Sequence, residues 1–151
     1  MKLASSLLLV AGLLLMSGRP AAAQALKLMV SGSPATMTIS TIASPGQQPT
    51  AVVDASTDYR VTVNAQAMKI TASLSAPMPV GVTLTAQFAA PPGATSSGPV
   101  ALDATSRDLV INISNVTNSR NIITYTLSAT VAAGVIPLQS RTVLLTLVNY
   151  P

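Results

Sequence analysis

The chain has 151 residues and a formal net charge of +4, and only 8% of its residues are charged. It contains no Cys, no His and no Trp, and all four of its acidic residues are Asp. These absences exclude a disulfide, a Ser-His-Asp triad, a thiolate nucleophile and the usual zinc ligands, so we predict no catalytic residue, no cofactor, no metal site and no enzyme.

The first predicted element is a secretory signal peptide over residues 1–23. Lys2 supplies a positive start, residues 7–16 form an apolar run, and residues 21–23 form an A-x-A cleavage site. The apolar run is shorter than the about 20 residues that a membrane-spanning helix needs. Every later apolar run is interrupted by Thr, Ser or Pro. We therefore expect residues 24–151 to be exported, secreted or held at the cell surface, and not transmembrane after cleavage.

The charges that remain after the leader are few and scattered. Residues 24–151 contain six basic residues against four Asp, and the basic residues occur one by one. A nucleic-acid-binding surface needs clustered cations, often with aromatic residues, so no nucleic-acid partner is expected. Charged residues make up about a quarter of an ordinary soluble domain, so this low charge is typical of a surface that is covered or that stacks.

Alternation of apolar and polar residues with a period of two dominates the rest of the chain. Pro- and Gly-rich turns separate the runs at intervals of about 8–12 residues, the pattern of an all-β sandwich or barrel. No linker, internal repeat or long helical period is present, so we predict one domain of about eight strands over residues 24–151. The alternating runs are residues 26–30, 36–42, 58–63, 68–74, 82–88, 100–102, 108–113, 121–130 and 140–150.

Two groups of polar residues could carry a function, and each has a purely structural alternative. Asp54 and Asp58 could share a Ca²⁺ ion, but their spacing does not match an EF-hand loop and Asp is common in turns, so we expect a turn. Asn112 and Asn115 each begin an N-x-S/T sequence, the acceptor for N-glycosylation. In a Thr-rich chain such matches arise by chance, and we expect "SNVTNSR" to be a polar turn.

The final run, residues 140–150, is one of the strongest strand signals in the chain. Val143, Leu145 and Leu147 share one face, and the opposite face also carries aliphatic residues. An uncovered strand of this kind promotes aggregation, so we expect it to be covered on both sides. Two interpretations stay open: the strand lies in the middle of its own sandwich, or it borders a groove that another chain fills.

The segment "ITYTLSATVAAGVIPLQSRTVLLTLVNYP" at the end of the chain resembles the C-terminal end of chaperone–usher pilins and of the related spore-coat-U-type secreted domains. Those proteins end in a strand pair joined around a glycine, with an alternating Thr/Val last strand and a tyrosine near the terminus. Tyr125, Gly134, residues 142–148 and Tyr150 stand where that pattern places them. Two features depart from it: Pro151 follows the tyrosine, and the cysteine pair of many pilins is missing.

The resemblance implies an incomplete immunoglobulin-like antiparallel β-sandwich that a strand from a neighbouring copy completes, which is donor-strand complementation. It also implies self-association into a polymer and a periplasmic chaperone as a further partner. The candidate donor is residues 24–31, and the alternative is that "LKLMVS" is simply the first strand of a self-contained fold. The predicted partner-binding residues are Leu26, Leu28 and Val30 on the donor and Val143, Leu145 and Leu147 in the acceptor core.

We therefore predict a structural subunit of an extracellular filament or coat, such as a pilus or fimbrium used in cell adhesion, that assembles by strand exchange. The alternative prediction is a monomeric secreted module that binds carbohydrate or a cell surface. Sugar-binding platforms usually need exposed aromatic side chains, and this chain has only three Tyr and one Phe.

Overall fold

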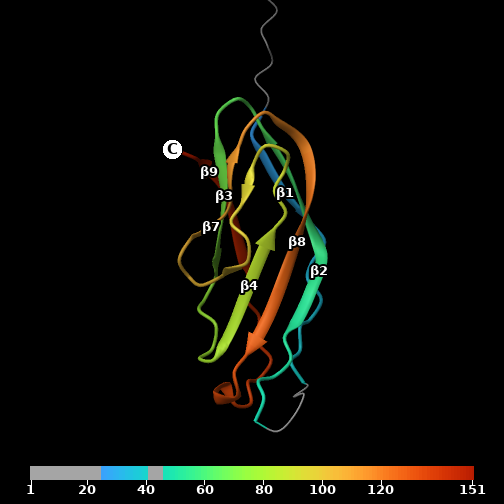
Figure 1. Cartoon of the computed structure of the whole chain (residues 1–151), viewed down its shortest axis with the longest axis vertical. Helices are drawn as coiled ribbons and strands as arrows, with labels where there is room; N and C mark the ends of the chain where they lie inside the picture. Colours follow the sequence, from blue (N-terminus) through green and yellow to red (C-terminus); the bar gives the residue numbers. More distant parts are fainter. Residues whose placement is uncertain (1–24, 41–45) are drawn as a thin grey trace, which may run out of the picture.

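The computed structural model describes residues 25–40 and 46–151, and the predicted signal peptide at residues 1–23 lies outside them (Figure 1). Within the described residues the chain forms nine β-strands and one short 3-10 helix, η1 (Val131–Ala133), and no helix there has the length and hydropathy of a membrane span. The strands are β1 (Lys27–Ser31), β2 (Val52–Val63), β3 (Met68–Leu74), β4 (Val82–Phe88), β5 (Thr95–Ser96), β6 (Val100–Ala101), β7 (Arg107–Ile113), β8 (Val116–Ala129) and β9 (Val143–Asn149).

The strands form two antiparallel sheets that pack face to face as a sandwich. The first sheet has the order β1-β2-β8-β4-β6, and the second has the order β5-β7-β3-β9. All the paired strands are antiparallel. The all-β sandwich predicted from the period of two is therefore confirmed.

The core lies between the sheets and contains most of the residues that the alternation placed inward. In β7, however, Val110 is completely buried, and Ile111, which the alternation placed inward, is only partly buried. Tyr59 and Phe88 are both completely buried, and their ring centroids lie 5.2 Å apart. The Tyr59 hydroxyl donates a hydrogen bond of 2.6 Å to the Ala89 carbonyl, so the polar end of this side chain is satisfied. The other buried apolar residues are Val61, Val63, Met68, Ile70, Ala72, Leu74, Ala86, Leu102, Leu109, Val110, Ile113, Val116, Ile123 and Tyr125.

Two segments that we predicted as turns belong to strands. "DASTDY" is a β-bulge within β2, where the pairing with β8 shifts register between Asp54 and Thr57. Most of "SNVTNSR" is the start of β8. The sequence pattern did not predict these strands, because polar residues occupy the bulge in β2 and the exposed positions at the start of β8. The strand predicted for residues 36–42 is also wrong over residues 36–40, which form no strand. Residues 41 and 42 lie outside the described part of the chain.

Three asparagines explain how β7 turns into β8. Asn112, Asn115 and Asn118 have φ angles of 57°, 52° and 49°, in the left-handed region where Asn is better tolerated than most residues. Asn115 lies in the turn, and its amide donates to the Asn64 carbonyl at 2.7 Å. Both N-x-S/T sequences therefore begin at positions where the backbone itself requires an unusual residue.

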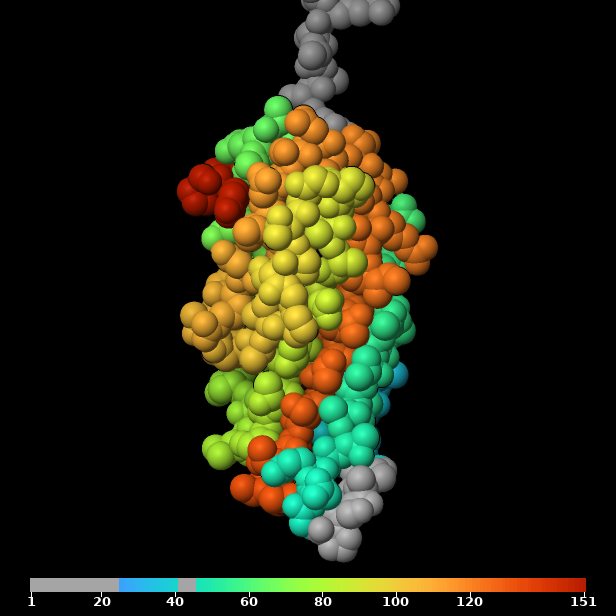
Figure 2. Space-filling model, viewed as in Figure 1, coloured from blue at the N-terminus to red at the C-terminus, as the bar shows by residue number. Residues whose placement is uncertain are grey.

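One flank of the sandwich is closed by residues 89–106, which connect β4 to β7. The Leu102 amide donates to the Leu84 carbonyl in the first sheet at 2.8 Å, and the Asp103 carbonyl accepts from Leu74 in the second sheet at 2.7 Å. Leu102 and Pro91, two residues of this segment, are buried; the segment appears in yellow in Figure 2. The opposite flank is formed by the edge strands β1 and β9.

Candidate strand-docking site

The last strand, β9, lies at an edge of its sheet. It pairs with β3 along its full length, from Met68 opposite Asn149 to Leu74 opposite Val143, and has no second neighbour within the described residues. The interpretation that this strand lies in the middle of its own sandwich, covered on both sides, is therefore wrong. Sequence pattern could not decide this, because an apolar strand has the same alternation at an edge as in the middle of a sheet.

The backbone of β9 has a free edge. The Ser75 amide donates to the Thr142 carbonyl at 2.9 Å, and the Tyr150 amide donates to the Ala67 carbonyl at 3.0 Å. Since residues in an antiparallel strand alternate in the direction of their backbone groups, the even-numbered residues of β9 bond to β3. The amides and carbonyls of Val143, Leu145 and Leu147 therefore point away from β3.

The side chains of the same three residues point toward the core but are only partly buried. Val143, Leu145 and Leu147 pack against the core cluster without being enclosed by it. On the neighbouring β3, by contrast, Met68, Ile70, Ala72 and Leu74 are at most 3% exposed. The core is thus complete as far as β3 and incompletely covered at β9.

The facing edge strand, β1, is also incompletely covered. Leu28 lies opposite Val61 and packs against the core, and Val30 lies opposite Tyr59 on the same face. Val30 nevertheless remains 47% exposed, while Tyr59 is completely buried. In the described part of the chain, β1 and β9 belong to different sheets and no backbone hydrogen bond joins them. We call this open flank the β1–β9 seam and define it by Leu28, Val30, Val143, Leu145 and Leu147.

The structure therefore brings five of the six predicted partner-binding residues to one flank. The sixth, Leu26, precedes β1 and is 44% exposed. Within one copy β1 pairs with β2, as a self-contained fold requires. Use of β1 as a donor would need it to leave β2, and that use stays a prediction.

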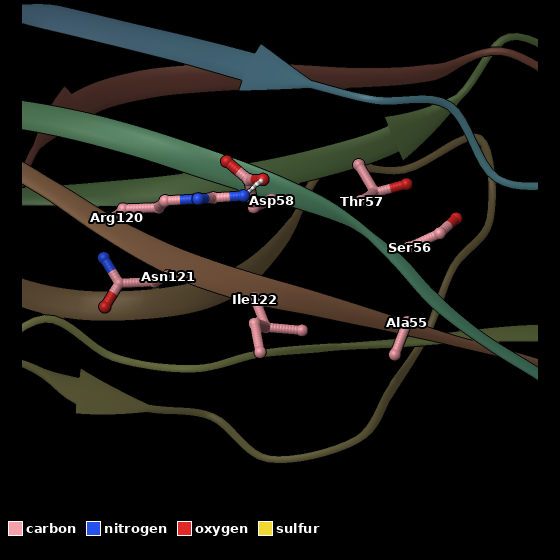
Figure 3. A pocket seen from close by; sticks show the side chains of 7 residues that line it. All are labelled: Ala55, Ser56, Thr57, Asp58, Arg120, Asn121 and Ile122. Carbon is pink, nitrogen blue, oxygen red and sulfur yellow. Dashed lines mark hydrogen bonds and ion pairs between the residues drawn. The ribbon is translucent and has the colours of Figure 1, made fainter.

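A small pocket lies at the bulge of β2, close to the end of β1 (Figure 3). It has a volume of about 350 Å³, and its seven lining residues come from β2 and β8. Arg120 donates to Asp58 at 2.6 Å, and this contact raises the pKa of the guanidinium above its ordinary value. Because Asp58 is the single acid in the pocket and is already paired, the pocket has no free acid–base pair for catalysis.

Two buried polar atoms at this bulge have no hydrogen-bond partner among residues 25–40 and 46–151. They are the Asp58 Oδ1 and the Thr57 Oγ1, and both residues are at least nine-tenths buried. A buried polar atom without a partner costs about 1–3 kcal/mol. Ser31, the last residue of β1, lies directly opposite Asp58, so the unsatisfied atoms are close to the point where β1 ends.

The Asp54 carboxylate is engaged separately from Asp58. It accepts from the Ser56 hydroxyl at 2.8 Å and from the Ser56 amide at 3.1 Å, and it accepts a longer bond of 3.4 Å from the Ala35 amide. These bonds, the Ser56 hydroxyl first, lower the pKa of Asp54 below its ordinary value of 3.8. Asp54 and Asp58 therefore bind different partners, Ser56 and Ala35 in one case and Arg120 in the other. The described residues contain no cluster of three or more His, Cys, Asp or Glu.

A second, more apolar pocket of about 610 Å³ lies at the end of the sandwich near η1, at the bottom of Figure 1. The loops around it carry aliphatic side chains that are largely exposed, and we call these four residues the apolar tip: Val80, Val131, Val135 and Leu138. We did not predict this surface. The available signal was the apolar content of "VAAGVIPLQS", which is unusual for a Gly- and Pro-interrupted loop.

The aromatic residues do not form an exposed platform. Tyr59 and Phe88 are completely buried, and Tyr125 is 4% exposed. Burial raises the pKa of Tyr125, and the nearby Asp54 charge adds to this effect. A carbohydrate-binding role would have to use Tyr150 alone, which is partly buried.

Comparison of this chain with protein-family models, with curated proteins and with solved structures finds no match. The resemblance to pilins and spore-coat-U-type domains thus remains a prediction from the residues at the end of the chain.

Proposed function

We propose that this protein is a structural subunit of an extracellular filament or coat, exported by its leader, and that copies assemble by exchanging β1. The observation that carries the proposal is the state of β9: its outer backbone edge is unpaired, and its three inward aliphatic side chains are only partly covered. One added strand would both pair with the free backbone edge of β9 and cover these side chains.

The acceptor side follows from the chemistry of strand addition. An extended segment gains main-chain hydrogen bonds along a free edge, and its alternate side chains fill the adjoining apolar surface. The free backbone edge consists of the outward amides and carbonyls of Val143, Leu145 and Leu147. The adjoining apolar surface consists of the half-covered side chains of the same residues. Native edges are usually protected by charges or prolines, and β9 contains neither.

The donor side follows from the spacing of β1. Leu26, Leu28 and Val30 recur at the period of two that Val143, Leu145 and Leu147 also have. Antiparallel docking with Leu28 opposite Leu145 would place Leu26 opposite Leu147 and Val30 opposite Val143. All three apolar pairs then form at once, in the strand direction that every pair in this sandwich uses.

Release of β1 from its own sheet is favoured by its weak attachment. No residue of β1 is fully buried, and only Leu28 among them packs against the core. The Asp58 Oδ1 atom, which has no hydrogen-bond partner, lies where Ser31 of β1 pairs with β2, and its cost further weakens the attachment of β1 to β2. Because donor and acceptor are different surfaces, the contact is head-to-tail, and such contacts build open filaments when they do not close into a ring.

A disulfide lock tests the proposal, since the chain has no cysteine of its own. Met29 lies opposite Arg60 on the outer face of the β1–β2 ladder, at a spacing that a disulfide can bridge. Oxidised Met29→Cys/Arg60→Cys protein of residues 24–151 should remain particulate in electron micrographs, and reduction should restore filaments.

The matched control joins two strands that the proposal leaves in place. Thr83 lies opposite Ser128 in the β4–β8 ladder, so oxidised Thr83→Cys/Ser128→Cys protein should form filaments normally. Filaments from the oxidised β1–β2 lock, or isolated particles from the unmodified protein under all assembly conditions, would contradict the proposal. Isolated particles throughout would favour the monomeric binding module.

A further inference from the structure

The apolar tip is an unusually exposed aliphatic surface. Val135, Val80 and Leu138 are 99%, 93% and 86% exposed, and Val131 is 53% exposed. Single exposed aliphatic residues are ordinary on protein surfaces, but Val131, Val135 and Leu138 line one apolar pocket, and Val80 directly follows Pro79, which lines the same pocket. A grouped surface of this kind is typical of an interaction site.

Among the described residues that line this pocket, Arg141 alone is charged. Its guanidinium donates to the Pro77 and Ser140 carbonyls and to the Gln139 side chain, and it has no carboxylate partner. Three of the four Asp in the chain have a cation: Asp58 with Arg120, Asp103 with Arg107 and Asp108 with Lys69. The fourth, Asp54, has none, so the molecule presents one unpaired carboxylate and, at the tip, an unpaired guanidinium.

Asp54 lies beside the point where β1 leaves the body of the protein. A Cβ on Gly32 would lie 2.9 Å from the Ser56 carbonyl oxygen, and Ser56 is bonded to Asp54. The Ser56 hydroxyl also donates to the Ser33 carbonyl at 3.4 Å, and the Ala35 amide donates to Asp54. The chain after Gly32 is therefore fixed to the bulge of β2, and a released β1 would pivot at Gly32 next to Asp54.

The docking register given above then determines which surfaces meet. If Leu28 of the donor lies opposite Leu145 of the acceptor, Gly32 of the donor falls opposite Arg141. The donor's body therefore lies against the end of the acceptor at which β9 begins. That end carries the apolar tip and Arg141, and the donor brings Asp54 and the 62%-exposed Val53 to the same place.

We propose that the apolar tip, with Arg141, is a second contact surface for another copy of this chain, namely the copy that donates its β1. The tip packs on the donor around the β2 bulge, and Arg141 pairs with the donor's Asp54. This inference rests on the proposed function, because it takes strand donation as given and assigns the surface that orients successive subunits.

The test separates strand exchange from tip contact. Single-cysteine proteins Leu28→Cys and Leu145→Cys are mixed under oxidising conditions, and the mixed disulfide reports exchange. The critical concentration for polymerisation, measured by sedimentation, reports the full interface. Both are measured in the same cysteine background with Val135→Ser/Leu138→Ser, with Arg141→Gln, and with the controls Leu144→Ser and Arg60→Gln. Val135, Leu138 and Leu144 are exposed, and Arg60, Arg141 and the two cysteine positions are only partly buried, so every variant should fold.

The aliphatic double variant should raise the critical concentration about tenfold or more, because two exposed aliphatic side chains lose their burial. Arg141→Gln should raise it about two- to fivefold, as expected for one surface ion pair. Both should still form the mixed disulfide, and the controls should behave as the unmodified background. Formation of the mixed disulfide with an unchanged critical concentration in both tip variants would overturn this inference alone. Absence of the mixed disulfide in the unmodified background would overturn the proposed function, and this inference with it.

Discussion

Gly32 lies against the backbone of Ser56, so close that a Cβ on Gly32 would stand 2.9 Å from the Ser56 carbonyl oxygen. Its φ of 81° is in the left-handed region that favours glycine. A side chain at this position would therefore be strained and would force a shift where the chain leaves β1 and passes over the β2 bulge. The contact fixes the C-terminal end of β1, the strand that we propose is exchanged.

Substitution Gly32→Ala should loosen β1 on its own sheet. The positive φ and the contact with a backbone oxygen together should cost about 1–3 kcal/mol. Amide hydrogen exchange of Met29, whose backbone groups face Arg60 of β2, should accelerate. Gly93→Ala is the matched control, because Gly93 has the same φ of 81° and nothing within 4 Å of its added Cβ. If both substitutions accelerated amide exchange in β1 equally, the contact between Gly32 and Ser56 would not be what fixes β1.

Truncation of facing residues on β3 and β9 should separate folding from assembly. Ile70 is completely buried and lies opposite Leu147, which is partly buried. Ile70→Ala should lower the free energy of unfolding by about 2–5 kcal/mol, as for other core truncations. Leu147→Ala should lower it less in the monomer and should raise the critical concentration for polymerisation. Urea unfolding and sedimentation measure the two effects, and equal losses of stability would show that β9 is already covered.

The Arg120–Asp58 ion pair at the bulge should contribute to the stability of the fold, because the Asp58 side chain is largely buried. Asp58 has a side chain only 12% exposed, against 64% for Arg120. Arg120→Leu should leave the Asp58 carboxylate without its partner and lower the urea midpoint. Arg107→Leu is the control, since the Arg107–Asp103 pair is exposed on both sides and such pairs contribute little. The double variant Asp58→Leu/Arg120→Leu should recover most of the loss, and failure to recover would assign the effect to the Arg120 stem instead.

Acid should release the contacts of Asp54. Its bonds to Ser56 and Ala35 lower its folded pKa below the ordinary 3.8, so the stabilisation is present above that value and is lost as pH falls through the folded pKa. Amide exchange of Ser56 and Ala35, corrected for its intrinsic pH dependence, should therefore rise between about pH 5 and about pH 2. Asp54→Asn protein should lack this transition, and the same transition in both proteins would assign it to another group.

The sequence predicted those elements whose residues face a core on one side and solvent on the other. Met68, Ile70, Ala72 and Leu74 alternate with polar residues, and the strand they define matches β3 at both ends. The prediction failed where polar residues belong to a strand, as at Asp54 in the β2 bulge and at Asn118 in β8. It also failed at residues 36–40, which alternate but form no strand.

The sequence by itself determined that this chain folds as an all-β domain, because side-chain direction in a strand has a period of two and burial must follow it. It also selected all five residues that meet at the β1–β9 seam, since each is aliphatic at an inward position, and a sixth, Leu26, that lies outside it. Only the tertiary structure decided that β9 is an edge, that β1 lies on β2, and that residues 89–106 close the opposite flank. Strand order depends on pairings between residues far apart in the chain, and the local alternation of a strand is the same whether one neighbour or two lie beside it.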